Sequence, residues 1–213
     1  MKKTIIFLAI IMAFTCTNAQ MPDKFVKAME RIVPAVDTTS NSGSMLELAN
    51  AFERIAEAEK NQWLAYYYAA LCQVNYSYME QDKTKIDAIA DKATELIDKA
   101  DALQSNNSEI SCIKSMIASS HMMVNPMQRF MEYGQEAQSF IDAATKQDPT
   151  NPRPEYLKGQ GLKYTPEQFG GGCANAKPVL QSALAKYGTF KPASEIHPSW
   201  GKQRVELLIS ECK

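Results

Sequence analysis

The residues best suited to contact a ligand are aromatic and gather in one stretch. Residues 63–78 contain one tryptophan and five tyrosines. Tyr and Trp are common in binding surfaces because they combine a large contact area with a polar group. The same spacing fits a helical stripe that fills a core, although three consecutive tyrosines cannot share one stripe. We therefore predict that most of the cluster is core and that one or two members line a groove; the candidates are Trp63, Tyr67, Tyr68 and Tyr76.

Metal and redox chemistry would need histidines and cysteines that converge. His121 and His197 are the only histidines of the sequence, and no cysteine spacing resembles a zinc site or a C-x-x-C redox motif. His121 follows an apolar helical segment, which favours a place at the core boundary. His197 precedes Pro198 and belongs to an expected turn. The sequence therefore predicts no metal site.

Catalytic motifs are absent from the sequence. Three glycines at 170–172 precede an expected helix, as in a phosphate-binding loop, but no Lys-Ser/Thr follows them. A sharp turn between two helices is the better interpretation. The sequence also contains no G-x-S-x-G and no H-E-x-x-H motif. We expect no catalytic residue, no cofactor and no enzyme activity.

The first residues have the pattern of a signal peptide. Lys2 and Lys3 precede an apolar run at 5–14, and small residues at 17–19 fit cleavage after Ala19. We expect a signal peptide at 1–19 and one domain at 20–213, exported to the periplasm. Secretion or a lipid anchor on Cys16 is the alternative, although the residues before Cys16 fit a lipoprotein signal poorly.

Composition then narrows the class of the remaining chain. From Gln20 onward the net charge is −3, without the basic surface of a nucleic-acid-binding protein. No later segment is apolar enough for a transmembrane helix. Nine glycines, ten prolines and few β-branched runs favour helices over strands. We predict an all-α protein that binds no nucleic acid.

A small–large–small triplet recurs along the chain at nearly even intervals. In each copy Ala is followed by Ile or Leu four residues later and by Ala three residues after that. This spacing places all three side chains on one helical stripe. The stripe should bury the central residue between neighbouring helices. The copies are Ala51-Ile55-Ala58, Ala93-Ile97-Ala100, Ala137-Ile141-Ala144 and Ala176-Leu180-Ala183.

These triplets resemble the second helices of tetratricopeptide repeats. Ala137, Ile141, Ala144 and Pro149 match all four family positions, and the resemblance covers about residues 45–190. It implies a right-handed solenoid of antiparallel helix pairs, a TPR-like superhelix, with a closing C-terminal helix. Residues 164–172, 176–178 and 197–201 also resemble segments of exported TPR-like proteins of Gram-negative bacteria, and of the periplasmic helical component of tripartite uptake transporters.

The cysteines indicate how the C-terminal end is fixed. Four cysteines follow residue 20, which allows three pairings as two disulfides. If the closing helix packs antiparallel on its predecessor, Cys212 in its last turn lies beside Cys173 in the predecessor's first turn. We predict a Cys173–Cys212 disulfide. Cys72 and Cys112 should be buried free thiols.

Two functions of different classes fit these observations. The first is a periplasmic or secreted TPR-like binding or scaffold protein with a protein or peptide partner, because helical solenoids present extended concave surfaces. The alternative is an accessory solute-binding subunit of an envelope uptake system. An open groove with exposed tyrosines would favour the first, and a deep pocket would favour the second.

Overall fold

The protein is all-helical over residues 21–212, the part of the chain that the computed structural model describes. The expected signal peptide and Cys16 lie outside these residues. Within them there is no strand, and no helix is long and apolar enough to cross a membrane. The α-helices are α1 (Asp23–Ile32), α2 (Ser42–Ala58), α3 (Trp63–Met79), α4 (Lys83–Leu103), α5 (Ser108–Val124), α6 (Pro126–Arg129), α7 (Gln135–Gln147), α8 (Arg153–Tyr164), α9 (Cys173–Thr189) and α10 (Lys202–Glu211). Short helical turns are η1 (Val33–Ala35), the π-helical η2 (Phe130–Gly134) and η3 (Glu167–Phe169).

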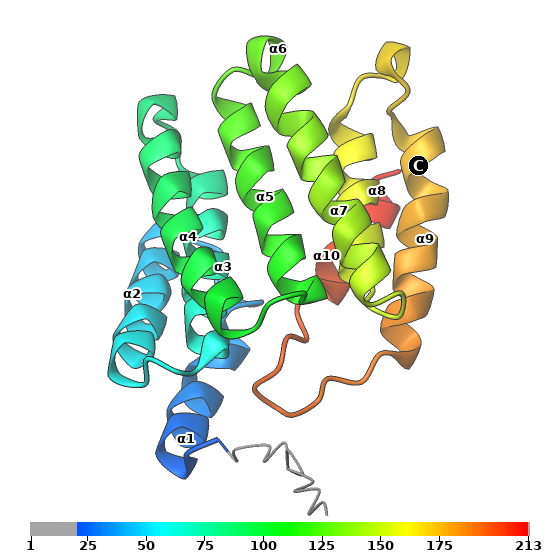
Figure 1. Cartoon of the computed structure of the whole chain (residues 1–213). Helices are drawn as coiled ribbons and strands as arrows, with labels where there is room; N and C mark the ends of the chain where they lie inside the picture. The colour runs from blue at the N-terminus through cyan, green and yellow to red at the C-terminus, as the bar shows by residue number, and fades with distance from the viewer. Residues whose placement is uncertain (1–20, 213) are drawn as a thin grey trace, which may run out of the picture.

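Helices adjacent in the sequence are also adjacent in space. From α2 to α5, and from α7 to α10, each helix packs against the next, and α5 packs on α7. Figure 1 shows α4, α5 and α7 side by side, with α3 and α8 behind them. The all-α prediction is confirmed. The right-handed TPR-like superhelix of helix pairs stays a prediction.

Three of the four predicted triplets form the buried stripes of their helices. Their central residues Ile97, Ile141 and Leu180 are 1%, 8% and 0% exposed, so the expected burial is confirmed. The first triplet is wrong, because α2 buries Phe52 and Ala56 instead of Ile55 and its flanking alanines. Phe52 stacks on Tyr68 of α3 at 5.1 Å, and this larger ring sets the rotation of α2.

Polar residues and glycines mark where several helices begin. Asn41, Asp82 and Asn107 cap α2, α4 and α5 by accepting hydrogen bonds from backbone N–H groups of the first turn. The glycine run forms the turn before α9. Gly172 has a φ of +87°, and a Cβ on Gly171 would lie 2.0 Å from the Thr165 carbonyl oxygen.

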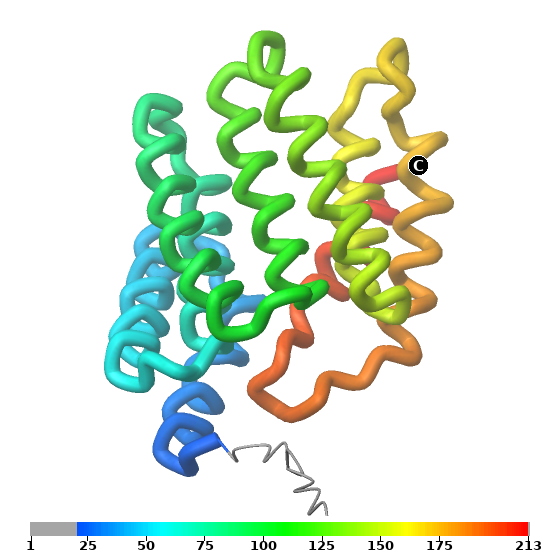
Figure 2. Tube along the Cα trace, viewed as in Figure 1, coloured from blue at the N-terminus to red at the C-terminus, as the bar shows by residue number. Residues whose placement is uncertain are grey.

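The C-terminal end is closed as the cysteine pattern suggests. Cys173 and Cys212 form a disulfide with a Cα–Cα separation of 5.2 Å. The inner face of α10 is buried, with Val205 and Leu208 both 0% exposed. Cys72 and Cys112 are buried free thiols, and burial raises the pKa of both. Between α9 and α10 a segment without helix, residues 190–201, crosses the lower end of the bundle (Figure 2).

Candidate functional site

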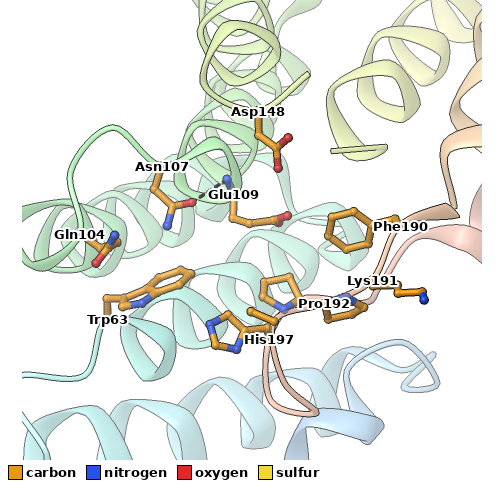
Figure 3. A pocket seen from close by; sticks show the side chains of 11 residues that line it. Trp63, Gln104, Asn107, Glu109, Asp148, Phe190, Lys191, Pro192 and His197 are labelled. Atoms are coloured by element: carbon orange, nitrogen blue, oxygen red, sulfur yellow. Dashed lines mark hydrogen bonds between the residues drawn. The ribbon is translucent and has the colours of Figure 1, made fainter. Parts of the chain in front are cut away.

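One cavity lies where residues 190–201 pass the ends of the other helices. We call it the loop pocket. Its volume is about 440 Å³, within the range of small-molecule sites. One wall comes from the α9–α10 segment, and the other from the starts of α3 and α5 and the turns that precede α5 and α8 (Figure 3). Its lining residues are Trp63, Gln104, Asn107, Glu109, Asp148, Phe190, Lys191, Pro192, Ala193, His197 and Pro198.

Only one of the four predicted groove aromatics lines this pocket. Trp63 is half-buried at the first position of α3, with its ring 6.1 Å from the His197 ring. Tyr67 and Tyr68 are 0% and 1% exposed, so their prediction as groove residues is wrong. Helix α3 is covered by α2, α4 and α5, and therefore buries side chains on every face. Tyr76 is half-buried against the core and does not line the pocket.

A buried ion pair forms the floor of the loop pocket. Nη1 of Arg153 donates to Oε1 of Glu109 at 2.8 Å, and the Asn151 amide donates to the same oxygen at 2.9 Å. The Tyr67 hydroxyl donates to the other carboxylate oxygen at 3.0 Å and accepts from the Trp200 indole at 2.7 Å. Burial raises the pKa of Glu109, whereas Arg153 and these donors oppose that shift. The network ties α3, α5, α8 and the C-terminal segment together.

Arg153 occupies an aromatic cage under the pocket. Its side chain is 0% exposed, and its Cζ lies 5.0 Å from the Trp200 ring, 5.2 Å from the Phe190 ring and 5.9 Å from the Tyr187 ring. Nε and Nη2 have no acceptor among the described residues, and the ring faces partly compensate the buried charge. Phe190 contacts this guanidinium with its ring and also lines the pocket (Figure 3).

His197 is held in the pocket wall by a tight turn. Its backbone N–H donates to the Ser194 carbonyl at 3.0 Å, and its Nδ1 lies 2.7 Å from the Ser194 hydroxyl. The neighbouring residues Ile196 and Pro198 are buried and anchor the turn. Burial lowers the pKa of His197, so the imidazole is neutral near pH 7. The predicted turn at His197 is confirmed.

The second cavity lies between α4, α5 and α7. We call it the helix pocket; its volume is about 330 Å³. Its histidine, His121, is already engaged: Nδ1 is 2.9 Å from Asp87, Nε2 is 3.6 Å from Asp91, and the ring stacks on Tyr133. Arg129 holds the same Asp87 carboxylate. The lining residues are Asp91, Thr94, Ile97, Asp98, Lys114, Ile117, Ala118, His121, Tyr133, Glu136 and Phe140.

Sequence reasoning missed the residues that build the loop pocket opposite Trp63. Phe190 and Lys191 follow α9 in a segment without periodicity, and Glu109 and Arg153 belong to no motif. One signal was available: two aromatic residues, two prolines and one histidine cluster in 190–200, which is unusual for a plain connection. The partnership between Glu109 and Arg153 depends on how α8 packs against α5.

Comparison with known proteins shows a similarity to a solved structure. No protein-family model matches the chain, and no curated protein matches it. Among solved structures, the HusA haemophore from Porphyromonas gingivalis superposes with a TM-score of 0.79 at 34% sequence identity. The match covers 89% of this chain and 92% of that chain. Because a third of the residues are identical over nearly the whole of both proteins, this chain belongs to the same family as the HusA haemophore.

Proposed function

We propose that this protein binds haem or a related porphyrin in the loop pocket and acts as an exported carrier of that molecule. The observation that carries the proposal is the 34% identity to a haemophore over 92% of its length. The proposal joins the expected export to the alternative function suggested by the sequence, a solute-binding component of envelope uptake. It involves no reaction, so the protein is proposed to be a binding protein without enzyme activity.

The chemistry of the loop pocket fits a flat aromatic ligand better than that of the helix pocket. Trp63 and Phe190 lie on opposite sides of the loop pocket, with Pro192 between them (Figure 3). Pro198 also lines the pocket and adds apolar surface. Aromatic and apolar faces bind a planar macrocycle by stacking and by excluding water. The charge of Glu109 is already balanced by Arg153, and Lys191 at the rim supplies a cation for ligand carboxylates.

The helix pocket is less suitable for an anionic macrocycle. Its lining contains three acidic residues and one lysine: Asp91, Asp98, Glu136 and Lys114. Lys114 is paired with Asp98 and Asp101, at 3.4 Å and 2.7 Å. A porphyrin with two carboxylates would meet like charges there, which is unfavourable for binding. The helix pocket therefore serves as the internal comparison for the loop pocket.

The protein or peptide partner expected from the concave surface of a helical solenoid stays a prediction. Two of its four candidate contacts, Tyr67 and Tyr68, are core residues and present no surface to a partner. The remaining two, Trp63 and Tyr76, lie on different parts of α3, and of these two Trp63 lines the loop pocket.

The test is a titration with metal-free protoporphyrin IX, followed through quenching of tryptophan fluorescence. Trp63 lines the loop pocket and Trp200 lies beneath it, and the sequence contains no other tryptophan. We expect saturable quenching, and about tenfold weaker binding in Phe190→Ala, since losing one stacking face costs about 1.4 kcal/mol. Tyr133→Ala, in the helix pocket, is the matched control and should bind as the unmodified protein does.

Each other outcome is informative about the proposal. If Tyr133→Ala weakens binding and Phe190→Ala does not, the ligand lies in the helix pocket and the site is wrong. If protoporphyrin IX produces no saturable quenching, and haem added separately does not either, the porphyrin-carrier function is wrong. Circular dichroism of each variant checks that the helical fold is unchanged.

A further inference from the structure

We propose that the disulfide between Cys173 and Cys212 controls how often the loop pocket opens, so that its reduction by a dithiol speeds the release of a bound ligand. Cys173 is the first residue of α9, and Cys212 directly follows α10. The segment 190–201, one wall of the loop pocket, connects these two helices. The disulfide therefore closes a ring of chain that contains this wall. Ligand release rests on the proposed function, whereas opening of the wall does not.

Helix α10 is held at both of its ends in the oxidised protein. At its start, the Gly201 N–H donates to Oδ1 of Asp37 at 3.3 Å. The Trp200 indole, just before it, donates to the Tyr67 hydroxyl at 2.7 Å. At its other end, Cys212 is bonded to α9. If α10 and the wall undock with the disulfide intact, they remain in a closed loop, which has much less conformational freedom than a free chain end. The oxidised form therefore resists opening.

The non-covalent contacts of α10 are weaker than the disulfide. The Lys163 ammonium pairs with Glu211, whose side chain is 40% exposed. Exposed ion pairs contribute little to stability because water screens them. Two of the ten residues of α10 are buried, Val205 and Leu208. After reduction, α10 is a short terminal helix with a small buried face, and such elements open locally at a low cost in free energy.

Opening at this end removes one side of the loop pocket. Six of the eleven residues that line the pocket belong to segment 190–201. The opposite side, which includes Trp63, comes from helices and turns that precede α8 in the chain. A flat ligand between Trp63 and Phe190 is held from both sides while the wall is in place (Figure 3). When α10 undocks, the wall is fixed to α9 alone, and the ligand can leave.

The reduction itself is an ordinary exchange with a dithiol. Cys173 is half-buried and Cys212 is 2% exposed, so the reductant reaches Sγ of Cys173 first. A thiolate of the dithiol attacks this sulfur, the protein disulfide breaks, and Cys212 leaves as a thiolate that takes up a proton. The second thiol of the reductant then displaces Cys173. Two electrons and two protons pass to the protein, and the dithiol becomes a disulfide. Cys72 and Cys112 are 0% exposed, which keeps them from the reductant.

Hydrogen exchange detected by mass spectrometry tests the opening without a ligand. The unmodified chain is compared before and after reduction with dithiothreitol. We expect the amides of residues 190–212 to exchange at least about tenfold faster after reduction, whereas those of α2–α5 keep their rates. The double variant Cys173→Ser/Cys212→Ser should exchange like the reduced protein. Dithiothreitol should not change this variant further, which controls for other effects of the reductant.

Release of metal-free protoporphyrin IX tests the consequence for the ligand. The complex is mixed with an excess of serum albumin as the acceptor, and dissociation is followed through porphyrin fluorescence. We expect dissociation at least about tenfold faster from the reduced protein and from the double variant than from the oxidised protein. Circular dichroism should show the same helix content in all three, because the opening is local.

The outcomes that would overturn the proposal differ from those that concern the proposed function. Equal exchange of residues 190–212 in both forms would show that the disulfide does not control the wall. Faster exchange throughout the chain would show that it supports the whole fold instead. Faster exchange with unchanged dissociation would refute control of release and leave the porphyrin function standing. If protoporphyrin IX does not bind the oxidised protein, the proposed function is wrong, and hydrogen exchange alone decides whether the disulfide controls the wall.

Discussion

Helix α8 contains two glycines that differ in one respect, the space around a side chain. A Cβ added to Gly159 would lie 2.7 Å from both Cγ and Cδ2 of Leu180 and 3.3 Å from the Leu180 backbone nitrogen. Leu180 is 0% exposed in α9, so it has no room to move away. At Gly161, two residues later in the same helix, a Cβ would have nothing within 4 Å. Comparing the alanine variants at these two positions therefore separates the energetic cost of the steric clash from the gain in helix propensity.

The expected magnitudes follow from these two effects. Alanine favours a helix over glycine by about 1 kcal/mol at either position, so Gly161→Ala should stabilise the protein by about 0.5–1 kcal/mol. At Gly159 overpacking of a filled core costs about 1–3 kcal/mol and offsets or exceeds that gain. Gly159→Ala should therefore be less stable than Gly161→Ala by about 1–3 kcal/mol. For a domain of this size, each kcal/mol corresponds to about 2–4 °C in Tm.

The assay is urea denaturation followed by circular dichroism at 222 nm, with thermal melts as a second measure. Both variants should unfold with the same m-value as the unmodified protein, because the surface exposed on unfolding is unchanged. Equal free energies of unfolding for the two alanine variants would refute the close packing of α8 on α9. A destabilised Gly161→Ala would show that the helix itself is strained there.

Two further predictions concern covalent and ionic links. Replacing Cys173 and Cys212 together by serine should lower the free energy of unfolding by about 4 kcal/mol, because the disulfide closes a loop with a sequence separation of 39. Thiol titration of the denatured, unreduced protein starting at Gln20 should find two free thiols. A count of four thiols would contradict the pairing. Arg129 and, secondarily, His121 lower the pKa of Asp87 from 3.8 to about 2, so the pair stabilises the fold above pH 4 and this stability is lost as the pH falls towards 2. The shift corresponds to at most about 2.4 kcal/mol, and since Asp87 is 39% exposed, solvent reduces it to about 1 kcal/mol. Asp87→Asn should show this loss at pH 7 and match the unmodified protein at pH 2 in urea titrations; a constant difference across this range would exclude the ion pair as its cause.

Local patterns of the sequence were sufficient for most of the helices. Helices α5 and α8, at 108–124 and 153–164, are strongly periodic stretches with asparagine and proline turns around them, so their bounds follow from the local sequence. The stripe of α2 was misplaced by one residue, since an Ala-Ile-Ala pattern and the neighbouring Phe52 both satisfy a period of 3.6. Only the contact between Phe52 and Tyr68 on α3 decides which of these two helical stripes faces the core.

The binding candidate depends on contacts between distant parts of the chain. Composition indicates that Tyr67 and Tyr68 suit either a core or a surface; the packing of three helices around α3 makes them core. The hydrogen bond from Trp200 to Tyr67 spans 133 residues, and the pair of Arg153 and Glu109 spans 44. The sequence by itself determined which segments are helical, because helix formation depends on residues three or four apart. Only the tertiary structure decided that His197, Trp63 and Phe190 line one pocket, because that depends on how ten helices pack in the described chain.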